Sequence, residues 1–415
     1  MEHRHPVIVA GAGIIGASIA HELSLRGEKV ILVDRQEPGR GASFGNMASI
    51  AINGFDAVSR PSTWKKIPGW LVDPNAPVTA DPLYAMKMLP WFLKFLAAGR
   101  PSRIRAIEDA GASLATRALG DLIVMLDRVG ARDMLSEASC LSLYGSEKAF
   151  DDDRGNRALM DRYGLKYQVL TGDAIREREP ELNPAIPKAT LLPQNHFISD
   201  PFLLVKRLVE ATRKNGGDLI TGDIARVEHD NRGVTALILK DGRRLETDRL
   251  VLATGVETRA LAEALDEPIP LETERGYHTQ IMKPGIAMRY SVIWPHRAFM
   301  VTPTAGGIRV GGNVELAGLD AAPDFRRPRV LVRHAQRALP GLKVEETTEW
   351  MGHRPALPDT IPIISPSSKM PGVFYATGHG HLGLTFSATT ALVIADMVTG
   401  LKPSLDVTPF RIDRY

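Results

Sequence analysis

Residues 7–34 read VIVAGAGIIGASIAHELSLRGEKVILVD, and this stretch decides the fold. An apolar run is followed by a GxGxxG turn, a helical pattern and a second apolar run that ends in a carboxylate, Asp34. Gly11 permits the sharp turn, Gly13 lets backbone N–H groups approach a pyrophosphate, and Gly16 lets the helix pack closely on the strand. The helix N-terminus, with its unpaired N–H groups and its dipole, favours negative charge. The sequence therefore predicts a βαβ dinucleotide-binding unit with Asp34 on the ribose.

Length and composition restrict the class of protein. The chain has 415 residues, of which 44% are hydrophobic and 24% charged, as in a globular protein that is too long for one core. We therefore expect two domains. The net charge is +3 without a lysine- or arginine-rich run, so nucleic acid is not expected as a partner. The single cysteine, Cys140, excludes an intramolecular disulfide and a multi-cysteine metal site, and no metal centre is expected.

The N-terminal residues indicate where the protein resides. Residues 1–6 lead directly into the first strand and leave no room for a signal peptide. The chain has no uninterrupted apolar stretch of about 18 residues, so a membrane-spanning helix is not expected. We therefore expect a cytoplasmic protein, and peripheral contact with the inner membrane stays open.

Apolar periodicity and turn residues predict the elements of the middle of the chain. Helical spacing predicts helices over 104–130 and 155–165. Asp200 is a good N-cap and Pro201 suits the first position of a further helix. Alternating residues predict a set of strands. These strands cover 224–228, 234–239, 244–248, 249–255, 277–282, 298–302, 308–312 and 373–378.

A second glycine turn, ATGHGHLGLT at residues 376–385, indicates which cofactor is bound. It leads into a helix over 385–398. A simple NAD dehydrogenase has no need of such a turn, whereas a flavoprotein does. The flavin ring gains negative charge at N1 and the C2 carbonyl oxygen when it is reduced, and a helix N-terminus aimed there stabilises that charge. The pair of turns therefore favours FAD.

Motifs in one family's order cover nearly the whole chain. They are residues 7–34, the loop 41–46 (GASFGN), 199–201 (SDP), 251–255 (VLATG), 275–277 (RGY), 307–315, 350–355 (WMGHRP) with 358–359 (PD), and 376–385. With these motifs the chain resembles the D-amino-acid oxidase superfamily of FAD-dependent enzymes, and within it the bacterial D-amino-acid dehydrogenases and the glycine/sarcosine oxidases. The histidine-rich last turn resembles the branch that acts on D-proline and cis-4-hydroxy-D-proline.

The resemblance and the order of the motifs imply a two-domain α/β fold. A Rossmann-like FAD-binding domain of the glutathione-reductase type is expected to be discontinuous, built from residues 1–80, 196–269 and 348–415. An inserted α+β substrate domain with an antiparallel sheet is expected from residues 81–195 and 270–347.

The resemblance implies oxidation of the Cα–N bond of a D-amino acid to an imino acid, by hydride transfer to flavin N5. A guanidinium group binds a carboxylate through two parallel hydrogen bonds. Arg354 is the first choice for the substrate carboxylate, because the family's glycine oxidases resemble the segment 352–355 (GHRP) at the position that binds this group. A surface or interdomain arginine is the alternative. Since hydride transfer needs only a neutral substrate amine, no obligatory general base is expected.

Other candidates near the substrate are open to two interpretations. Tyr277 lends its hydroxyl to the substrate or belongs to the core. Arg309 is a second carboxylate anchor or, as we favour, pairs with Glu315. Three histidines tune the flavin, bind the substrate or are structural. They are His353, His379 and His381.

The expected cofactor-binding residues come from the two glycine turns, the first loop and the central strands. They are Gly11, Gly13, Ile14, Ile15, Gly16, Asp34, Arg35, Ser43, Asn46, Val227, Thr254, Gly255, Gly378, Gly380, His381, Leu382, Gly383, Leu384 and Thr385. Ser43 and Asn46 are expected on the diphosphate or the ring, and Val227 on adenine through its backbone. The family's covalent flavins use a histidine or cysteine. Because the first loop offers Asn46 and the last turn no cysteine, we expect non-covalent FAD.

The stretch 84–98 combines large apolar side chains with cations. They are Trp91, Phe92, Lys94, Phe95, Leu96 and Arg100. Packing within the inserted domain is the favoured interpretation, and docking at a membrane surface, where a dehydrogenase passes electrons to quinone or the respiratory chain, is the alternative. The functional alternatives are a glycine/sarcosine-type oxidase that uses oxygen and a non-catalytic flavoprotein subunit of a larger complex.

Overall fold

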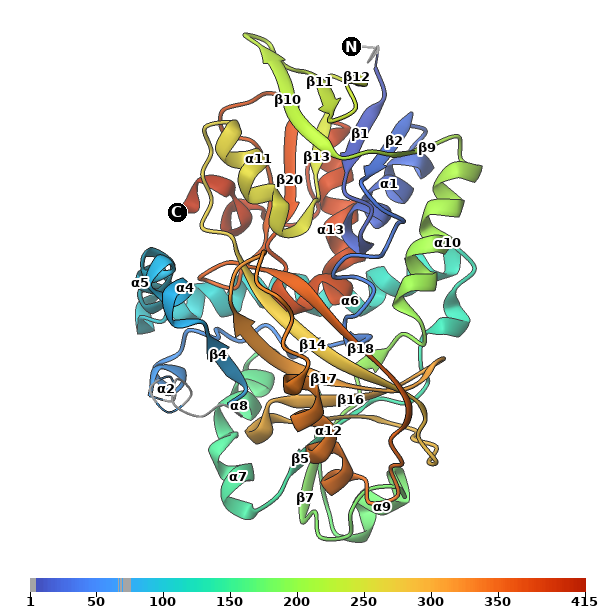
Figure 1. The fold of residues 1–415 in the computed structure, drawn as a ribbon, viewed down its shortest axis with the longest axis vertical. Coiled ribbons are helices and arrows are strands. Elements are labelled where there is room, and N and C mark those ends of the chain that lie inside the picture. Colours follow the sequence, from blue (N-terminus) through green and yellow to red (C-terminus); the bar gives the residue numbers. More distant parts are fainter. Residues whose placement is uncertain (1–4, 66, 68, 70–75) are drawn as a thin grey trace.

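The structure is a computed structural model that describes residues 5–65, 67, 69 and 76–415 (Figure 1). Residues 1–4, which bear on the expected absence of a signal peptide, lie outside the described residues. So do residues 66, 68 and 70–75, which belong to the predicted FAD-binding part.

A mainly parallel sheet forms the upper half of Figure 1. In the described chain its order is β19-β20-β13-β1-β2-β9, with β19 antiparallel to β20 and the other pairs parallel. The strands are β1 (Val7–Ala10), β2 (Val30–Asp34), β9 (Asp218–Thr221), β13 (Leu250–Leu252), β19 (Ile363–Pro366) and β20 (Val373–Thr377). Three distant parts of the sequence therefore meet in one sheet, as the order of the motifs predicts.

Strand alternation sorts the residues of β1 between two layers. Val7 and Val9 pack with the helices α1 (Ile14–Leu25), α10 (Pro201–Lys214) and α13 (Gly383–Val398). Ile8 and Ala10 face the other layer. That layer contains the antiparallel sheet β10 (Ile224–Asp230), β11 (Gly233–Leu239) and β12 (Arg244–Glu246), and the helix α11 (Thr258–Ala264). Both faces of the parallel sheet are thereby buried.

A second, mainly antiparallel sheet forms the lower half of Figure 1, with α12 (Arg326–Ala338) packed on it. In the described residues its order is β18-β14-β17-β16-β15-β5-β7-β6, and β4 pairs with β17. The strands are β4 (Val78–Ala80), β5 (Cys140–Tyr144), β6 (Gln168–Thr171), β7 (Lys188–Leu192), β14 (Glu272–Lys283), β15 (Ser291–Trp294), β16 (Phe299–Thr304), β17 (Gly307–Leu316) and β18 (Glu345–Ala356).

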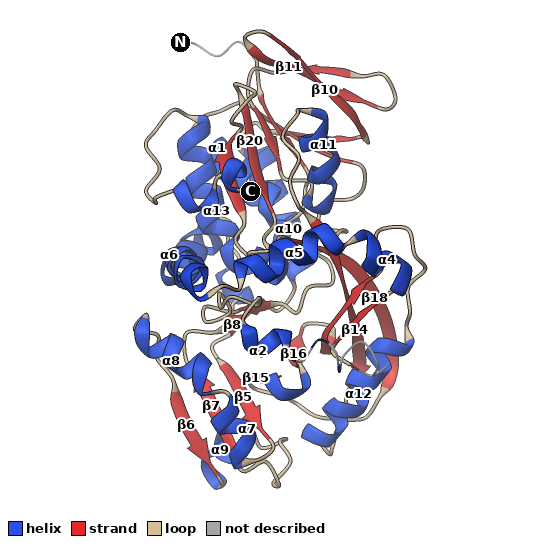
Figure 2. Cartoon of the chain, turned by 90° about the vertical axis from the view of Figure 1, so that its left-hand side faces the viewer, coloured by secondary structure: helices blue, strands red, loops and turns tan. Residues whose placement is uncertain are grey.

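Helices lie between and around the two sheets (Figure 2). The long helix α6 (Pro101–Arg128) shares a hydrophobic core with α13, and α4 (Pro82–Lys87) and α5 (Leu89–Ala98) precede it. The remaining elements are α2 (Pro61–Trp64), α7 (Glu147–Asp152), α8 (Arg154–Arg162), α9 (Asp173–Arg178), the two-stranded pair β3 (Ser49–Ile50) and β8 (His196–Phe197), and the 3-10 turns η1 (Arg132–Met134), η2 (Gly255–Glu257), η3 (Pro295–Arg297), η4 (Gly380–Leu382), η5 (Thr408–Phe410) and η6 (Ile412–Arg414).

The predicted fold class is confirmed, and the predicted helices and strands are found close to their expected bounds. The expected domain boundary at residue 348 falls inside β18, and the division into ranges stays a prediction. One described segment, Gly380–Val398, has the length and hydropathy of a membrane span, but 72% of it is buried, as in a core helix.

Candidate active site

A cavity of about 1420 Å³ is lined by residues from both sheets. It exceeds the roughly 300–1,000 Å³ of ordinary small-molecule pockets and so has room for a dinucleotide together with a substrate. Most of the predicted site residues line it. These are Gly11, Gly13, Ile14, Ile15, Asp34, Arg35, Ser43, Asn46, Thr254, Gly255, His353, Arg354, Gly378, His379, Gly380, His381, Leu382, Gly383 and Leu384.

The first glycine turn leaves no space for side chains. Gly11 has a φ of +100°, and a Cβ there would collide with the carbonyl oxygen of Ala253. A Cβ on Gly16 would collide with the carbonyl oxygen of Gly11. Gly16 therefore lies behind the cavity wall and acts through packing, as its predicted role in the helix–strand contact requires. The N-terminus of α1 opens onto the cavity. Its N-cap residue, Gly13, has no side chain that could cap the helix.

The loop after β2 is tied to this turn by polar side chains. Asp34 accepts hydrogen bonds from the N–H groups of Ala12, at 2.7 Å, and Gln36, at 3.0 Å. Ser43 Oγ accepts one from the N–H of Ile14 at 2.8 Å. Each of these side chains therefore shapes the cavity as well as lining it.

Asn46 uses its side chain to fold its own loop. Its Nδ2 donates to the carbonyl oxygen of Ser43, and its Oδ1 accepts from the N–H of Ala48. Arg309 supports the same loop, because its Nη1 donates to the carbonyl oxygen of Asn46 at 2.6 Å. The favoured Arg309–Glu315 ion pair was wrong, since Glu315 pairs instead with Arg275 and Arg327.

Val227, the residue expected on adenine, does not lie in the cavity wall. It lies on β10, and its side chain packs against the core between the sheets. Ile224, Ala225 and Arg226, at the start of the same strand, line the cavity instead.

The second glycine turn brings the N-terminus of α13 to the cavity. Gly378 and Gly380 have φ values of +77° and +51°, and the helix begins at Gly383. Thr385, which does not line the cavity, accepts a hydrogen bond at its Oγ1 from the N–H of Ala51 at 3.0 Å. This bond attaches the first turn of α13 to the segment after β3.

The three candidate histidines have different surroundings. His379 is buried with its Nε2 3.0 Å from Thr390 Oγ1, and burial lowers its pKa to about 3. His353 Nδ1 lies 2.9 Å from Thr273 Oγ1, and burial lowers the pKa of its ring. His381 faces the cavity, and its pKa is lowered by burial and by nearby Arg354. The direction of the pKa shift favours the neutral form of each ring.

Arg354 lies on the cavity face of the second sheet. It is opposite Glu274 in the β14–β18 register, and the next pair on this face is Gly276 and Gly352. A Cβ on Gly276 would collide with the Arg354 guanidinium group, so that group lies flat on the glycine. Its Nη1 donates to the carbonyl oxygen of Asn313 at 3.3 Å, and the guanidinium group has no other hydrogen-bond acceptor in the described chain. Burial lowers the pKa of Arg354, and Glu274 opposes the shift.

Trp350 occupies the neighbouring position on the same face. A Cβ on Gly45 or on Gly352 would collide with its indole ring. The ring of His278 stacks on the indole with centroids 5.3 Å apart. The cross-strand pair Gly276 and Gly352 therefore leaves room for the side chains of Arg354 and Trp350 to lie against the sheet. Both of these side chains line the cavity.

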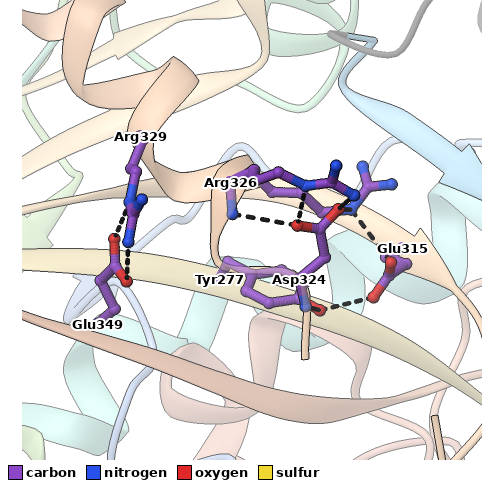
Figure 3. A network of polar contacts seen from close by, with 7 residues as sticks. Tyr277, Glu315, Asp324, Arg326, Arg329 and Glu349 are labelled. Carbon is purple, nitrogen blue, oxygen red and sulfur yellow. Dashed lines mark hydrogen bonds and ion pairs between the residues drawn. The ribbon is translucent and has the colours of Figure 1, made fainter. Parts of the chain in front are cut away.

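Tyr277 does not line the cavity, so its predicted contact with substrate was wrong. Its hydroxyl donates to Glu315 Oε2 at 2.6 Å and accepts from the N–H of Asp324 at 3.0 Å (Figure 3). Burial and the bond to Glu315 raise the pKa of Tyr277 to about 12. It is the core tyrosine of the alternative interpretation.

Sequence reasoning missed several polar residues that line the cavity. Glu274 directly precedes the Arg275-Gly276 motif, a position that could have drawn notice. Asp153 accepts hydrogen bonds from the hydroxyl of Tyr144 and from Asn156 Nδ2, each at 2.6 Å. Burial raises the pKa of the Asp153 carboxyl group. No local motif marked this second polar cluster.

The cavity fits FAD. The N-termini of α1 and α13 both open onto it, and glycines stand where backbone must come close to a ligand. Asp34 faces one end, while the sheet that carries Arg354 covers the other.

Comparison with known proteins gives the same result. Residues 6–397 match the model of the DAO family of FAD-dependent oxidoreductases. A D-amino-acid oxidase of Bradyrhizobium diazoefficiens is 31% identical, with 100% of this chain and 99% of that protein covered. A D-amino acid dehydrogenase of Sinorhizobium medicae is 29% identical, with 99% of each covered.

A solved structure has the same fold over the whole chain. Glycine oxidase from Geobacillus kaustophilus superposes with a TM-score of 0.77 at 20% identity, and 100% of both chains is covered. The match of the family model over nearly all of the sequence agrees with the two glycine turns and the shared cavity. The chain belongs to the DAO family of FAD-dependent oxidoreductases.

Proposed function

We propose that this enzyme oxidises the Cα–N bond of an amino acid to the corresponding imine. The observation that carries the proposal is the half-buried Arg354 guanidinium group, which lines the cavity and has one hydrogen-bond acceptor among the described residues. A cation in this position suits a carboxylate ligand. The names of the full-length relatives support an amino acid as that ligand.

Different residues of the chain would bind the cofactor and the substrate. Bound FAD supplies the ring that accepts a hydride. The α1 turn would hold the pyrophosphate and Asp34 a ribose hydroxyl, while the N-terminus of α13 would stabilise negative charge on the reduced ring. Arg354 would fix the substrate carboxylate and so hold Cα in place. The first loop, residues 35–46, contains no histidine or cysteine that could form a covalent link to the flavin. This favours non-covalent FAD.

The favoured substrates are D-amino acids, in particular D-proline and cis-4-hydroxy-D-proline. The support is the histidine-rich turn 378–383 and the relatives' names. We propose that the enzyme is a cytoplasmic dehydrogenase that passes electrons to quinone or the respiratory chain.

Exposed apolar residues on α4 and α5 support contact with a membrane surface. Leu83, Met86, Leu89 and Leu93 are 70%, 68%, 58% and 59% exposed. Exposed cations surround them, namely Lys87, Lys94, Arg100 and Arg103. Phe95 is buried, as the favoured packing interpretation predicts, whereas Trp91 and Phe92 line the cavity and Leu96 is 39% exposed. An anionic lipid surface complements this combination.

A panel of D- and L-amino acids, glycine and sarcosine tests the proposal. Under anaerobic conditions we expect D-proline or its hydroxylated form to bleach the flavin fastest. In air, we expect a quinone-like dye to be reduced with little release of peroxide. Fast peroxide release would indicate the oxidase alternative, and a flavin that no amino acid bleaches would indicate a non-catalytic subunit.

A further inference from the structure

Glu274 is a second charged residue at the substrate end of the cavity. It lies on β14 directly opposite Arg354 on β18, and side chains in such a cross-strand pair point to the same face of the sheet. Glu274 lines the cavity, and its exposed surface faces the cavity. An acid and a base thus lie side by side at the place where an amino acid would bind.

The Glu274 carboxylate is not used by the fold. In the described part of the chain, no hydrogen bond and no ion pair within 4 Å involves Glu274, while the acidic residues nearby in sequence and space are paired. Glu272 accepts from Tyr84 and pairs with Arg259, and Glu315 pairs with Arg275. The Arg354 guanidinium group lies over Gly276 instead of reaching Glu274. The Glu274 carboxylate is half-buried, and because no protein group pairs with its charge, it is available to a cationic ligand in the cavity.

The charged surroundings favour a proton acceptor at this position. Burial raises the pKa of Glu274, and Arg354 on β18 is the one charged group that opposes this shift. On the other neighbouring strand, β17, the lining residues Val314 and Leu316 are apolar. His353 and His381 line the same end with lowered pKa values, and Asp56 and Asp320 interact with those histidines.

We propose that Glu274 binds the ammonium group of the substrate and takes up its proton before hydride transfer. The inference rests on the proposed function, and it assigns a general base where none was expected to be obligatory. An amino acid is a zwitterion, and Arg354 and Glu274 together match its two charges. In the step, one N–H bond breaks and an O–H bond forms on Glu274, and the electron pair stays on nitrogen. Cα then loses hydrogen with its bonding pair to the bound FAD, and the nitrogen pair completes the C=N bond.

The test compares Glu274→Gln with wild type in holoenzyme form. Alkylammonium groups lose their proton near pH 10. We therefore expect Glu274→Gln to slow anaerobic flavin reduction by D-proline about 100-fold near pH 7, with recovery as the pH approaches about 10. The second readout is binding of pyrrole-2-carboxylate, which has the carboxylate but no ammonium group. Its affinity, followed by the flavin spectrum, should be unchanged or higher in the variant, because a like charge is removed.

Glu272→Gln is the matched control, since Glu272 lies on the same strand and outside the cavity lining. It should keep the wild-type pH profile. A Glu274→Gln variant with the wild-type pH profile overturns the assignment. So does equal slowing at every pH together with weaker pyrrole-2-carboxylate binding, which would indicate a damaged site. A wild-type flavin that no amino acid reduces contradicts the proposed function itself, whereas a reduced wild-type flavin with an unaffected variant contradicts only the role of Glu274.

Discussion

The guanidinium group of Arg354 rests on the backbone of Gly276, across the β14–β18 strand pair. A Cβ at position 276 would collide with Cζ and Nη2 of the arginine. We therefore expect Gly276→Ala to displace the carboxylate-binding group without touching the helix ends that hold FAD. A displacement of about 1 Å in a positioning group can cost about 100-fold in rate. The measurement is anaerobic flavin reduction at subsaturating amino acid.

Gly120→Ala is the control for that variant, because no atom lies within 4 Å of a Cβ built at Gly120 in α6. It should leave reduction unchanged and slightly stabilise the fold. Wild-type reduction kinetics in Gly276→Ala would show that the position of Arg354 does not matter for the reaction.

Arg354→Lys keeps the positive charge but loses the planar fork that binds a carboxylate through two bonds. Charge-assisted hydrogen bonds contribute about 1.5–3 kcal/mol each, so we expect the substrate affinity to fall by about 10- to 100-fold. FAD content, read from the visible absorbance of the purified protein, should stay at the wild-type level. Parallel loss of FAD and of substrate affinity would place the carboxylate site elsewhere.

Gly16→Ala should prevent FAD binding. A Cβ on Gly16 would collide with the carbonyl oxygen of Gly11, so α1 cannot keep its position behind the turn. We expect the variant to purify with little flavin and with a lower melting temperature. A yellow protein of wild-type stability would show that α1 can move away without loss of the site.

His21 makes the stability of the fold depend on pH. Its ring on α1 is 2% exposed, and in the described chain neither nitrogen has a hydrogen-bond partner. Burial, with a contribution from Arg128, lowers its pKa from 6.5 to about 4. Below pH 6.5 the unfolded chain binds a proton that the folded chain does not, so stability is lost as the pH falls from 6.5 towards 4.

We expect His21→Leu to lose less stability than wild type over this window, as measured by urea unfolding at both ends of it. Removal of an unpartnered buried polar group should also raise stability at neutral pH. An identical loss on acidification in both proteins would mean that other groups cause the whole effect.

Replacement of both Leu89 and Leu93 by Ser should reduce sedimentation with anionic lipid vesicles. These leucines are 58% and 59% exposed, so folding should not suffer. Leu401→Ser is the control, because Leu401 is equally exposed, at 59%, and lies far along the chain. If the wild-type protein does not sediment with the vesicles at low salt, the proposal of a membrane contact is wrong.

Helices and strands that are determined by residues close together in the sequence could be predicted. The β1–α1–β2 unit follows from glycine spacing, and the start of α10 follows from Asp200, whose Oδ1 accepts from the N–H groups of Phe202 and Leu203 at 3.0 Å. Arg354 lines the cavity as expected, because its motif resembles the family's over consecutive residues, and its role on the substrate carboxylate stays a prediction. The cavity residues of both glycine turns were found for the same reason.

Residues whose orientation depends on strand register could not be predicted. Arg309 and Glu315 are an even number of positions apart, which in a regular strand puts them on one face. The β14–β17 register shifts between Gly276 and His278, so the bulge places the two side chains on opposite faces. The predicted contact of Tyr277 with substrate was wrong for a related reason. Gly276 faces the cavity, so the next residue in the strand, Tyr277, faces the other side of the sheet.

The central claim is that Arg354 and the two glycine turns hold an amino acid against FAD in one cavity. The most direct test is anaerobic titration of the purified wild-type protein with D-proline, followed by its visible spectrum. The account predicts a yellow protein whose flavin bands bleach on addition of the amino acid, and whose bleaching Arg354→Lys weakens. A yellow protein that keeps its colour with every amino acid of the panel would contradict it.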